Sequence, residues 1–155
     1  MNVTNCVPCL PGFYCPITGI VTPSLKCTAG FWCKGGSHTP NPLDKSYGIS
    51  CPNGSYCPEG TPSPIRCPPG TYQPHTGKTS LSDCMSCDPG MYCGSSGLDA
   101  VTGSCMEGFF CIKNASTSEP RDGGSGNICP AGHYCPGQTS VPIRCPNATF
   151  MNHTG

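Results

Sequence analysis

The sequence is poor in the apolar residues that build an ordinary hydrophobic core. Leucine, isoleucine, valine and phenylalanine together make up 22 of the 155 residues, or 14%. Below about 20%, a chain usually buries too little apolar surface to offset the conformational entropy that it loses on folding. A core of the usual kind is therefore excluded, and another interaction must hold the chain in shape.

An excess of either charge and a long apolar run are also missing. There are eight Lys plus Arg and eight Asp plus Glu, and neither sign clusters, so we expect no nucleic-acid partner. No apolar run approaches the roughly 20 residues of a membrane-spanning helix, so we expect no span in this segment. The first residues, MNVTNC, do not have the pattern of a signal peptide, so we expect a mature form or an excerpt.

Cysteine, glycine and proline are abundant instead. The chain has 16 Cys, 21 Gly and 19 Pro, a composition typical of a disulfide scaffold with little helix and few regular strands. Disulfides at this density persist in oxidising compartments, so we expect an extracellular or cell-surface location. The expected disulfide residues are Cys6, Cys9, Cys15, Cys27, Cys33, Cys51, Cys57, Cys67, Cys84, Cys87, Cys93, Cys105, Cys111, Cys129, Cys135 and Cys145.

The cysteines repeat with a period of 78 residues. Each of the first eight recurs 78 positions later, and 31 of the 77 comparable positions are identical at this offset. The sequence therefore consists of two repeat units, 1–78 and 79–155. Gly155 matches Gly77, so the chain begins and ends at the same phase of the repeat. We expect a stretch or link of a longer array, and a complete two-repeat protein is the alternative.

A shorter phrase, Cys-x-x-Gly-x-aromatic-Cys, recurs within each unit. It starts at Cys9, Cys27, Cys51, Cys87, Cys105 and Cys129. A truncated form without the closing cysteine starts at Cys67 and at Cys145, and the second of these has Ala148 in place of the glycine. The phrase predicts a turn with its glycine at positive φ, then a short extended piece whose aromatic ring packs on a disulfide.

The stretch CPPGTYQPHTGKTSLSDCMSCDPGMYC, residues 67–93, resembles the ephrin-receptor-like cysteine-rich repeat. Such repeats occur in receptor ectodomains and in surface proteins of protists, including mastigoneme glycoproteins. The resemblance implies small β-hairpin modules in an elongated rod, no enzyme activity, and a disulfide between Cys67 and Cys84. Carried over by the period, Cys145 would pair with a following unit and Cys6 with a preceding one. The other pairings stay open, because eight cysteines allow 105 arrangements.

No pattern in the sequence favours a metal, a cofactor or catalysis. The Cys-x-x-Cys pairs 6–9 and 84–87 have zinc-ligand spacing, but no second close pair accompanies either, and the four histidines form no ligand motif. Asp44 and Asp122 recur with the period, so a calcium site is the alternative to a role in turns. We expect no metal site, no cofactor and no catalytic residue.

Sequons for N-linked glycosylation occur at five asparagines: Asn2, Asn53, Asn114, Asn147 and Asn152. In a secreted chain these would carry a bulky, solvating coat of glycans. Asn114 is the most favourable acceptor because it lies in a long loop between cysteines. Asn53 is the least favourable because it lies inside a phrase.

Together these features predict a small disulfide-rich fold, mostly irregular, with short antiparallel β-hairpins and little or no helix, extended into a tandem-repeat rod. The predicted function is structural: a segment or subunit of an extracellular filament, mastigoneme-like, or of a matrix. Its partners would be copies of the same repeat, head to tail, and attached glycans. The alternative is the stalk of a receptor or adhesion ectodomain that binds a protein ligand.

Overall fold

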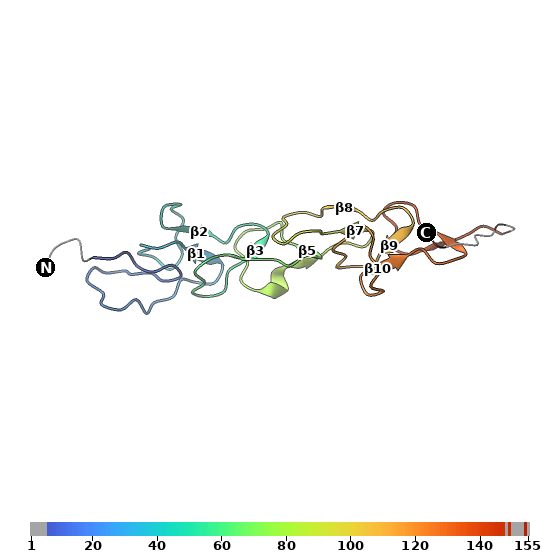
Figure 1. Cartoon of the computed structure of the whole chain (residues 1–155). Coiled ribbons are helices and arrows are strands. Elements are labelled where there is room, and N and C mark those ends of the chain that lie inside the picture. The colour runs from blue at the N-terminus through green and yellow to red at the C-terminus, as the bar shows by residue number, and fades with distance from the viewer. Residues whose placement is uncertain (1–5, 148, 150–153, 155) are drawn as a thin grey trace. The chain divides into compact units, whose positions relative to one another are not determined.

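The computed structural model describes residues 6–147, 149 and 154, and Figure 1 follows the chain from its N- to its C-terminus. Its internal contacts divide the chain into two compact units. Unit 1 comprises Met1–Arg66 with His75–Asp83, and unit 2 comprises Cys67–Pro74 with Cys84–Gly155. The boundary at residue 78 thus follows the sequence period. The compact units are divided differently, because residues 67–74 belong to unit 2 and residues 75–83 to unit 1.

Unit 1 contains two strand pairs. They are β1 (Phe31–Cys33) with β2 (Gly48–Ser50) and β3 (Ser55–Tyr56) with β4 (Ile65–Arg66). A single antiparallel bridge joins Phe13 and Lys26, and it is too short to form a pair of strands. The one helical element of the described residues is a turn of 3-10 helix, η2 (Leu81–Asp83).

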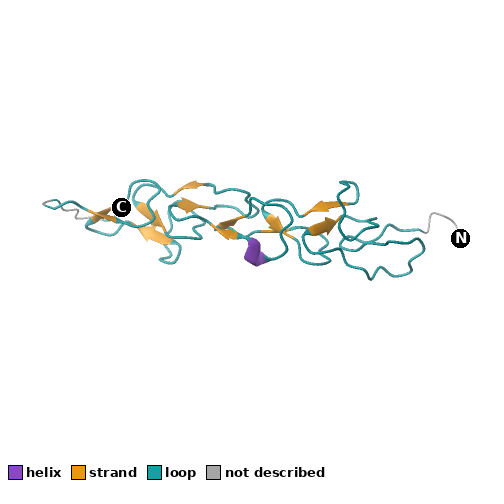
Figure 2. Cartoon of the chain, turned by 180° about the vertical axis from the view of Figure 1, so that it is seen from behind, coloured by secondary structure: helices purple, strands orange, loops and turns teal. Residues whose placement is uncertain are grey.

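Unit 2 contains four antiparallel pairs, each of two strands. They are β5 (Thr71–Tyr72) with β6 (Met85–Ser86), β7 (Met91–Tyr92) with β8 (Gly103–Ser104), β9 (Phe109–Cys111) with β10 (Gly126–Ile128), and β11 (His133–Tyr134) with β12 (Ile143–Arg144). Figure 2 shows these short strands joined by loops. The predicted fold class is confirmed: a small, disulfide-rich, irregular fold with short antiparallel strand pairs.

Among the described residues, the six strand pairs and the Phe13–Lys26 bridge have the same register, which follows from the phrase. The residue directly after the phrase glycine pairs with the residue directly before the next opening cysteine, as in Thr71 with Ser86 and His133 with Arg144. Loops of very different length fit between these two fixed points. The phrase therefore sets the hairpin, and the loop length does not disturb it.

Cystine takes the place of a hydrophobic core. Among the described residues, the buried hydrophobic side chains are twelve half-cystines, Phe109 and Ala115. In unit 2, Phe109 and Ala115 form a cluster with Cys105 and Cys111, and the ring of Tyr92 packs against it. The scarcity of large apolar residues is thus compensated by sulfur, as the composition predicted.

Fourteen cysteines form seven disulfides. Six of these bonds close a phrase on itself: Cys9–Cys15, Cys27–Cys33, Cys51–Cys57, Cys87–Cys93, Cys105–Cys111 and Cys129–Cys135. The seventh, Cys67–Cys84, is the pairing that the family resemblance implied. Cys6 and Cys145 are unpaired.

Candidate functional site

The feature that recurs throughout both units is the contact between one phrase and the next. We call each phrase a module and its contact with the following module a junction. The modules named below are 9–15, 27–33, 67–73, 87–93, 105–111, 129–135 and 145–151.

Four backbone hydrogen bonds define a junction, and the pair 87–93 and 105–111 shows them all. The N–H of Gly90 donates to the carbonyl oxygen of Cys111 at 2.8 Å, and the N–H of Cys105 donates to that of Gly90 at 2.8 Å. The N–H of Asn114 donates to Cys87 at 3.3 Å, and the N–H of Cys93 donates to Ala115 at 2.8 Å. All four bonds join backbone groups only.

The same four bonds recur at other junctions. Between modules 105–111 and 129–135 they are Gly108 to Cys135 (2.9 Å), Cys129 to Gly108 (2.8 Å), Gln138 to Cys105 (2.9 Å) and Cys111 to Thr139 (2.9 Å). Between modules 9–15 and 27–33 they are Gly12 to Cys33 (3.0 Å), Cys27 to Gly12 (2.9 Å), Gly36 to Cys9 (2.8 Å) and Cys15 to Ser37 (2.8 Å). The junction is therefore a repeated design in both units.

Two positions of the junction need a left-handed backbone. One is the phrase glycine: Gly90 has φ +81°, and a Cβ there would press against the carbonyl oxygen of Gln138. The other is the residue that donates to the opening cysteine. Glycine occupies it at Gly36, but Asn114 (φ 55°) and Gln138 (φ 68°) occupy it in the second repeat. The sequence predicted the first position and gave no signal for the second, because only the fold reveals what these residues share.

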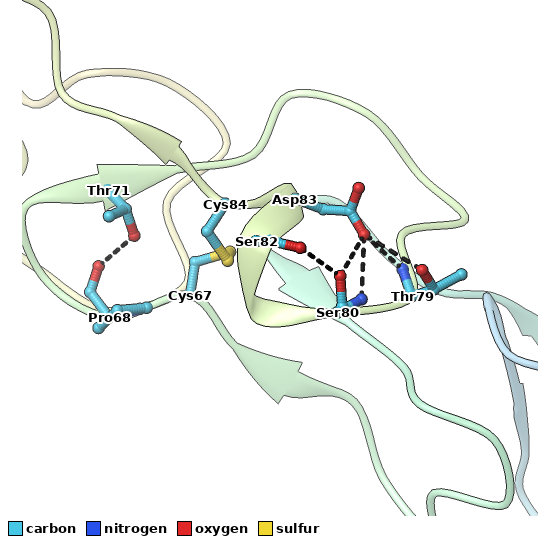
Figure 3. Close-up of a disulfide and its surroundings, with 8 residues drawn as sticks. All are labelled: Cys67, Pro68, Thr71, Thr79, Ser80, Ser82, Asp83 and Cys84. Atoms are coloured by element: carbon cyan, nitrogen blue, oxygen red, sulfur yellow. Dashed lines mark hydrogen bonds between the residues drawn. A yellow bond between two sulfur atoms is a disulfide. The ribbon is translucent and has the colours of Figure 1, made fainter.

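The junction between modules 67–73 and 87–93 differs in one respect. Module 67–73 has no closing cysteine, and Gln73, only 1% exposed, stands in its place. The N–H of Gln73 donates to the carbonyl oxygen of Leu98 at 2.8 Å, so the backbone bonds are preserved. Cys67 bonds instead to Cys84, as Figure 3 shows. Sequence reasoning did not single out Gln73, because a lone glutamine carries no motif.

Tyr72, in the same module, has a raised pKa. Burial is the first cause, followed by the neighbouring carboxylate of Asp88, which accepts the phenolic hydrogen bond at 3.4 Å. The phenol therefore stays neutral and serves as a donor at ordinary pH.

Two aspartates organise turns, and their pKa values are lowered as a result. The Asp83 carboxylate accepts hydrogen bonds from the backbone N–H groups of Thr79 and Ser80, both at 3.0 Å, and these lower its pKa (Figure 3). The hydroxyl and N–H of Ser125 donate to the Asp122 carboxylate and lower its pKa.

Asp44 and Asp122, the two acidic residues that recur with the period, have similar local roles. Asp44 accepts the backbone N–H of Ser46 at 2.9 Å, and Asp122 accepts that of Gly124 at 2.7 Å. These are Asx-type turns, in which the aspartate side chain closes the loop on its own backbone. The hydrogen bonds account for the recurrence without an ion.

The Cys-x-x-Cys spacing does not bring four sulfur ligands together. Cys84 is bonded to Cys67, and Cys87 to Cys93, so the second pair is divided between two disulfides. In the part of the chain that the structure describes, no three His, Cys, Asp or Glu residues lie close enough to hold a metal ion.

Three of the five sequon asparagines fall within the described residues. Asn53, Asn114 and Asn147 are all exposed, and Asn2 and Asn152 lie outside the described residues. Asn53 is exposed even though it belongs to the phrase that starts at Cys51, and it directly precedes Gly54, whose φ is 71°.

Comparison with known proteins supports a cysteine-rich repeat protein. The chain is similar to cysteine repeat modular protein B of Toxoplasma gondii, with 34% identity over 88 residues that cover 48% of this chain and 1% of that protein. The chain thus corresponds to a small part of that relative's length. A scan against protein-family models finds no match.

These findings point to an extracellular or secreted protein, because seven disulfides are typical of oxidising compartments. Among the described residues, no helix has the length and apolar character to cross a membrane.

Proposed function

We propose that this chain is a structural segment of an extracellular, glycosylated array of cysteine-rich repeats, such as a surface filament or matrix, and that it is not an enzyme. The observation that carries the proposal is the junction. In both units, module pairs such as 9–15 with 27–33 and 87–93 with 105–111 use the same backbone hydrogen bonds, and the hairpins have the same register.

Such an architecture suits a structural role because each module contacts chiefly its neighbours. Stability is then nearly a sum of module and junction terms, and length is added without redesign of the fold. Disulfides limit how far each module can be stretched, since the phrase is closed covalently over six residues. Glycans on exposed asparagines would keep strand edges of separate chains apart.

The similarity to a cysteine repeat modular protein supports the same reading. The name of that relative describes a modular repeat composition, and the chain matches 1% of its length, which fits one segment among many. The filament and its mastigoneme-like character are our proposal for this chain.

The experiment that tests the array is a comparison of the chain with its own tandem duplication. One lysine is inserted between the copies to stand for Lys78, so the period continues. Small-angle X-ray scattering should give a maximum dimension that nearly doubles. A compact globule would grow by only about 1.3-fold, because its radius scales as chain length to the power 0.38. Growth of that smaller size would overturn the proposal.

Imaging of native material separates the filament from the receptor stalk. Labelled antibodies against the chain should decorate continuous fibres at a regular spacing. Isolated molecules on the cell surface, each bound to a protein ligand, would favour the receptor or adhesion stalk.

A further inference from the structure

One end of unit 1 presents an incomplete junction, which we call the leading face and define as residues 6–20. Four of its backbone groups have no hydrogen-bond partner among the described residues: the N–H groups of Cys9 and Gly19 and the carbonyl oxygens of Cys15 and Ile20.

The matching groups in the second repeat, 78 residues later, are all bonded to module 67–73. Cys87 donates to Gly70 (2.9 Å), Gly97 donates to Cys67 (2.8 Å), Cys93 accepts from Gly70 (2.8 Å), and Leu98 accepts from Gln73 (2.8 Å). The leading face therefore offers the donors and acceptors of a junction at the same sequence spacing, and no module of the described residues occupies it.

The leading face is also hollow and apolar. A cavity of about 260 Å³ is lined by Cys6, Cys9, Cys15, Ile17, Gly19 and Ile20, among others. Two of the lining residues are apolar and largely exposed: Val7 is 87% exposed and Ile17 is 71% exposed. Exposed apolar side chains gathered around a hollow are typical of a contact surface.

Pro8 fits the strand edge that an incoming module would use. In the second repeat, Thr71 pairs with Ser86, and the N–H of Cys87 bonds to Gly70. Hydrogen-bonded and non-bonded pairs alternate along an antiparallel ladder, so Thr71 and Ser86 form a non-bonded pair. Pro8 stands at the position of Ser86 and has no N–H, so it loses no hydrogen bond there.

The chain carries a module of the required kind at its other end. The N–H and hydroxyl of Thr149 donate to the carbonyl oxygen of Pro146 at 3.2 and 2.6 Å, and those of Thr71 donate to Pro68 at 3.2 and 2.6 Å. Cys145 stands where Cys67 stands and is unpaired. Thr149 and Pro146 thus make the same two hydrogen bonds as Thr71 and Pro68.

We propose that the leading face of one copy binds module 145–151 of a second copy through a junction like that between modules 67–73 and 87–93. Cys145 of one copy then bonds to Cys6 of the next, at the positions of Cys67 and Cys84. This inference rests on the proposed function and supplies the array with an end-to-end contact, a β-strand addition between chains.

The covalent step needs an oxidant, and a small disulfide such as oxidised glutathione supplies it. The Cys145 thiolate attacks the reagent, and one thiol of the reagent leaves. The Cys6 thiolate then attacks the mixed disulfide and releases the second thiol. Two protein thiols lose two protons and two electrons, and the reagent is reduced to two thiols.

The incoming module has one imperfect residue, which makes the proposal testable. Ala148 stands at the position of Gly70, and a Cβ at Gly70 would press against the carbonyl oxygen of Asn114. In the docked pair, the carbonyl of Gly36 corresponds to that of Asn114. Ala148→Gly should therefore strengthen docking.

The experiment uses two variants of the 155-residue chain, each of which retains only one of the two unpaired cysteines. Cys6→Ser retains the Cys145 thiol, and Cys145→Ser retains the Cys6 thiol. Each alone and an equimolar mixture are incubated with oxidised and reduced glutathione, and disulfide dimers are followed by non-reducing electrophoresis and peptide mass spectrometry. We expect disulfide dimers to form at least ten times faster in the mixture than in either variant alone. Adding Ala148→Gly to the Cys6→Ser chain should raise the rate further.

The control is the same mixture in a denaturant that keeps the internal disulfides, where the preference should vanish. Equal rates in the mixture and in the separate variants under native conditions would overturn the proposal, and so would an Ala148→Gly variant no faster than its parent. The tandem chain can double in length whether or not separate copies bind, so this failure would leave the proposed function standing.

Discussion

The N–H of Gly90 lies 2.8 Å from the carbonyl oxygen of Cys111, the closing cysteine of the next module. This bond places the Gly90 α-carbon against the backbone of Gln138, which belongs to the loop after a third module. One glycine therefore contacts three successive modules, each of which is closed by its own disulfide.

Gly90→Ala should therefore destabilise the chain more than the same change at Gly132. Both are phrase glycines with positive φ, 81° and 75°, but nothing lies within 4 Å of a Cβ at Gly132. The left-handed backbone alone should cost about 1–2 kcal/mol at either site, and the clash at Gly90 should add about 1–3 kcal/mol. Guanidinium unfolding of the two variants measures the difference. Equal losses would contradict the role given to the Gln138 contact.

Asn114→Gly should preserve the fold, and Asn114→Val should not. Asn114 has φ 55° and holds the position that Gly36 holds in the first repeat. Glycine accepts this backbone freely, whereas a β-branched residue should lose about 1–2 kcal/mol. Thermal unfolding of the unglycosylated variants checks the order. A valine variant as stable as the glycine variant would show that the left-handed conformation is not required.

Asn114 should carry an N-linked glycan when the chain is secreted. The side chain is exposed, and the sequence around it is Asn-Ala-Ser. Intact-mass analysis before and after enzymatic removal of glycans should show one glycan fewer in Asn114→Gly than in the parent chain. Because the glycine variant is expected to fold, its loss of mass would report the sugar alone. An unchanged glycan mass would contradict the prediction.

The Cys67–Cys84 disulfide should contribute more to stability than a disulfide within a phrase. It spans 17 residues, whereas Cys129–Cys135 spans six. In the chain-entropy treatment, the longer loop gives about 3 kcal/mol and the shorter about 2 kcal/mol. Replacing each pair by serines and measuring the guanidinium midpoint tests the order. A larger loss for the Cys129–Cys135 pair would show that native packing outweighs loop entropy here.

The turns closed by Asp83 and Asp122 should open in acid. Both carboxylates accept backbone hydrogen bonds that lower their pKa values in the folded chain. A lowered native pKa gives stability that is complete above the unfolded value, about 3.9, and is lost as pH falls through the native value. Carboxyl carbon shifts in NMR should titrate below 3.9 at both residues, and Asp122→Asn should abolish the transition at its own turn only. A midpoint at or above 3.9 would contradict the hydrogen-bond assignment.

The sequence alone predicted much of the local structure. The 78-residue period and the Cys-x-x-Gly-x-aromatic-Cys phrase gave the hairpin modules, and the glycine at the fourth position of the phrase gave the positive φ seen at Gly12 and Gly90. These features are local, because a turn of seven residues depends on its own composition. The composition also predicted that cystine would replace a hydrophobic core, since too few apolar residues exist for any other solution.

The tertiary structure alone decided how the modules connect. The sequence left many disulfide pairings open. Only the fold shows that each full phrase closes on itself, as in Cys105–Cys111 with a Cα separation of 5.9 Å. Gln73 in place of a closing cysteine, and Asn114 in a site that glycine holds elsewhere, became visible only through backbone contacts with distant modules. Such contacts join residues far apart along the chain, so no local sequence pattern predicts them.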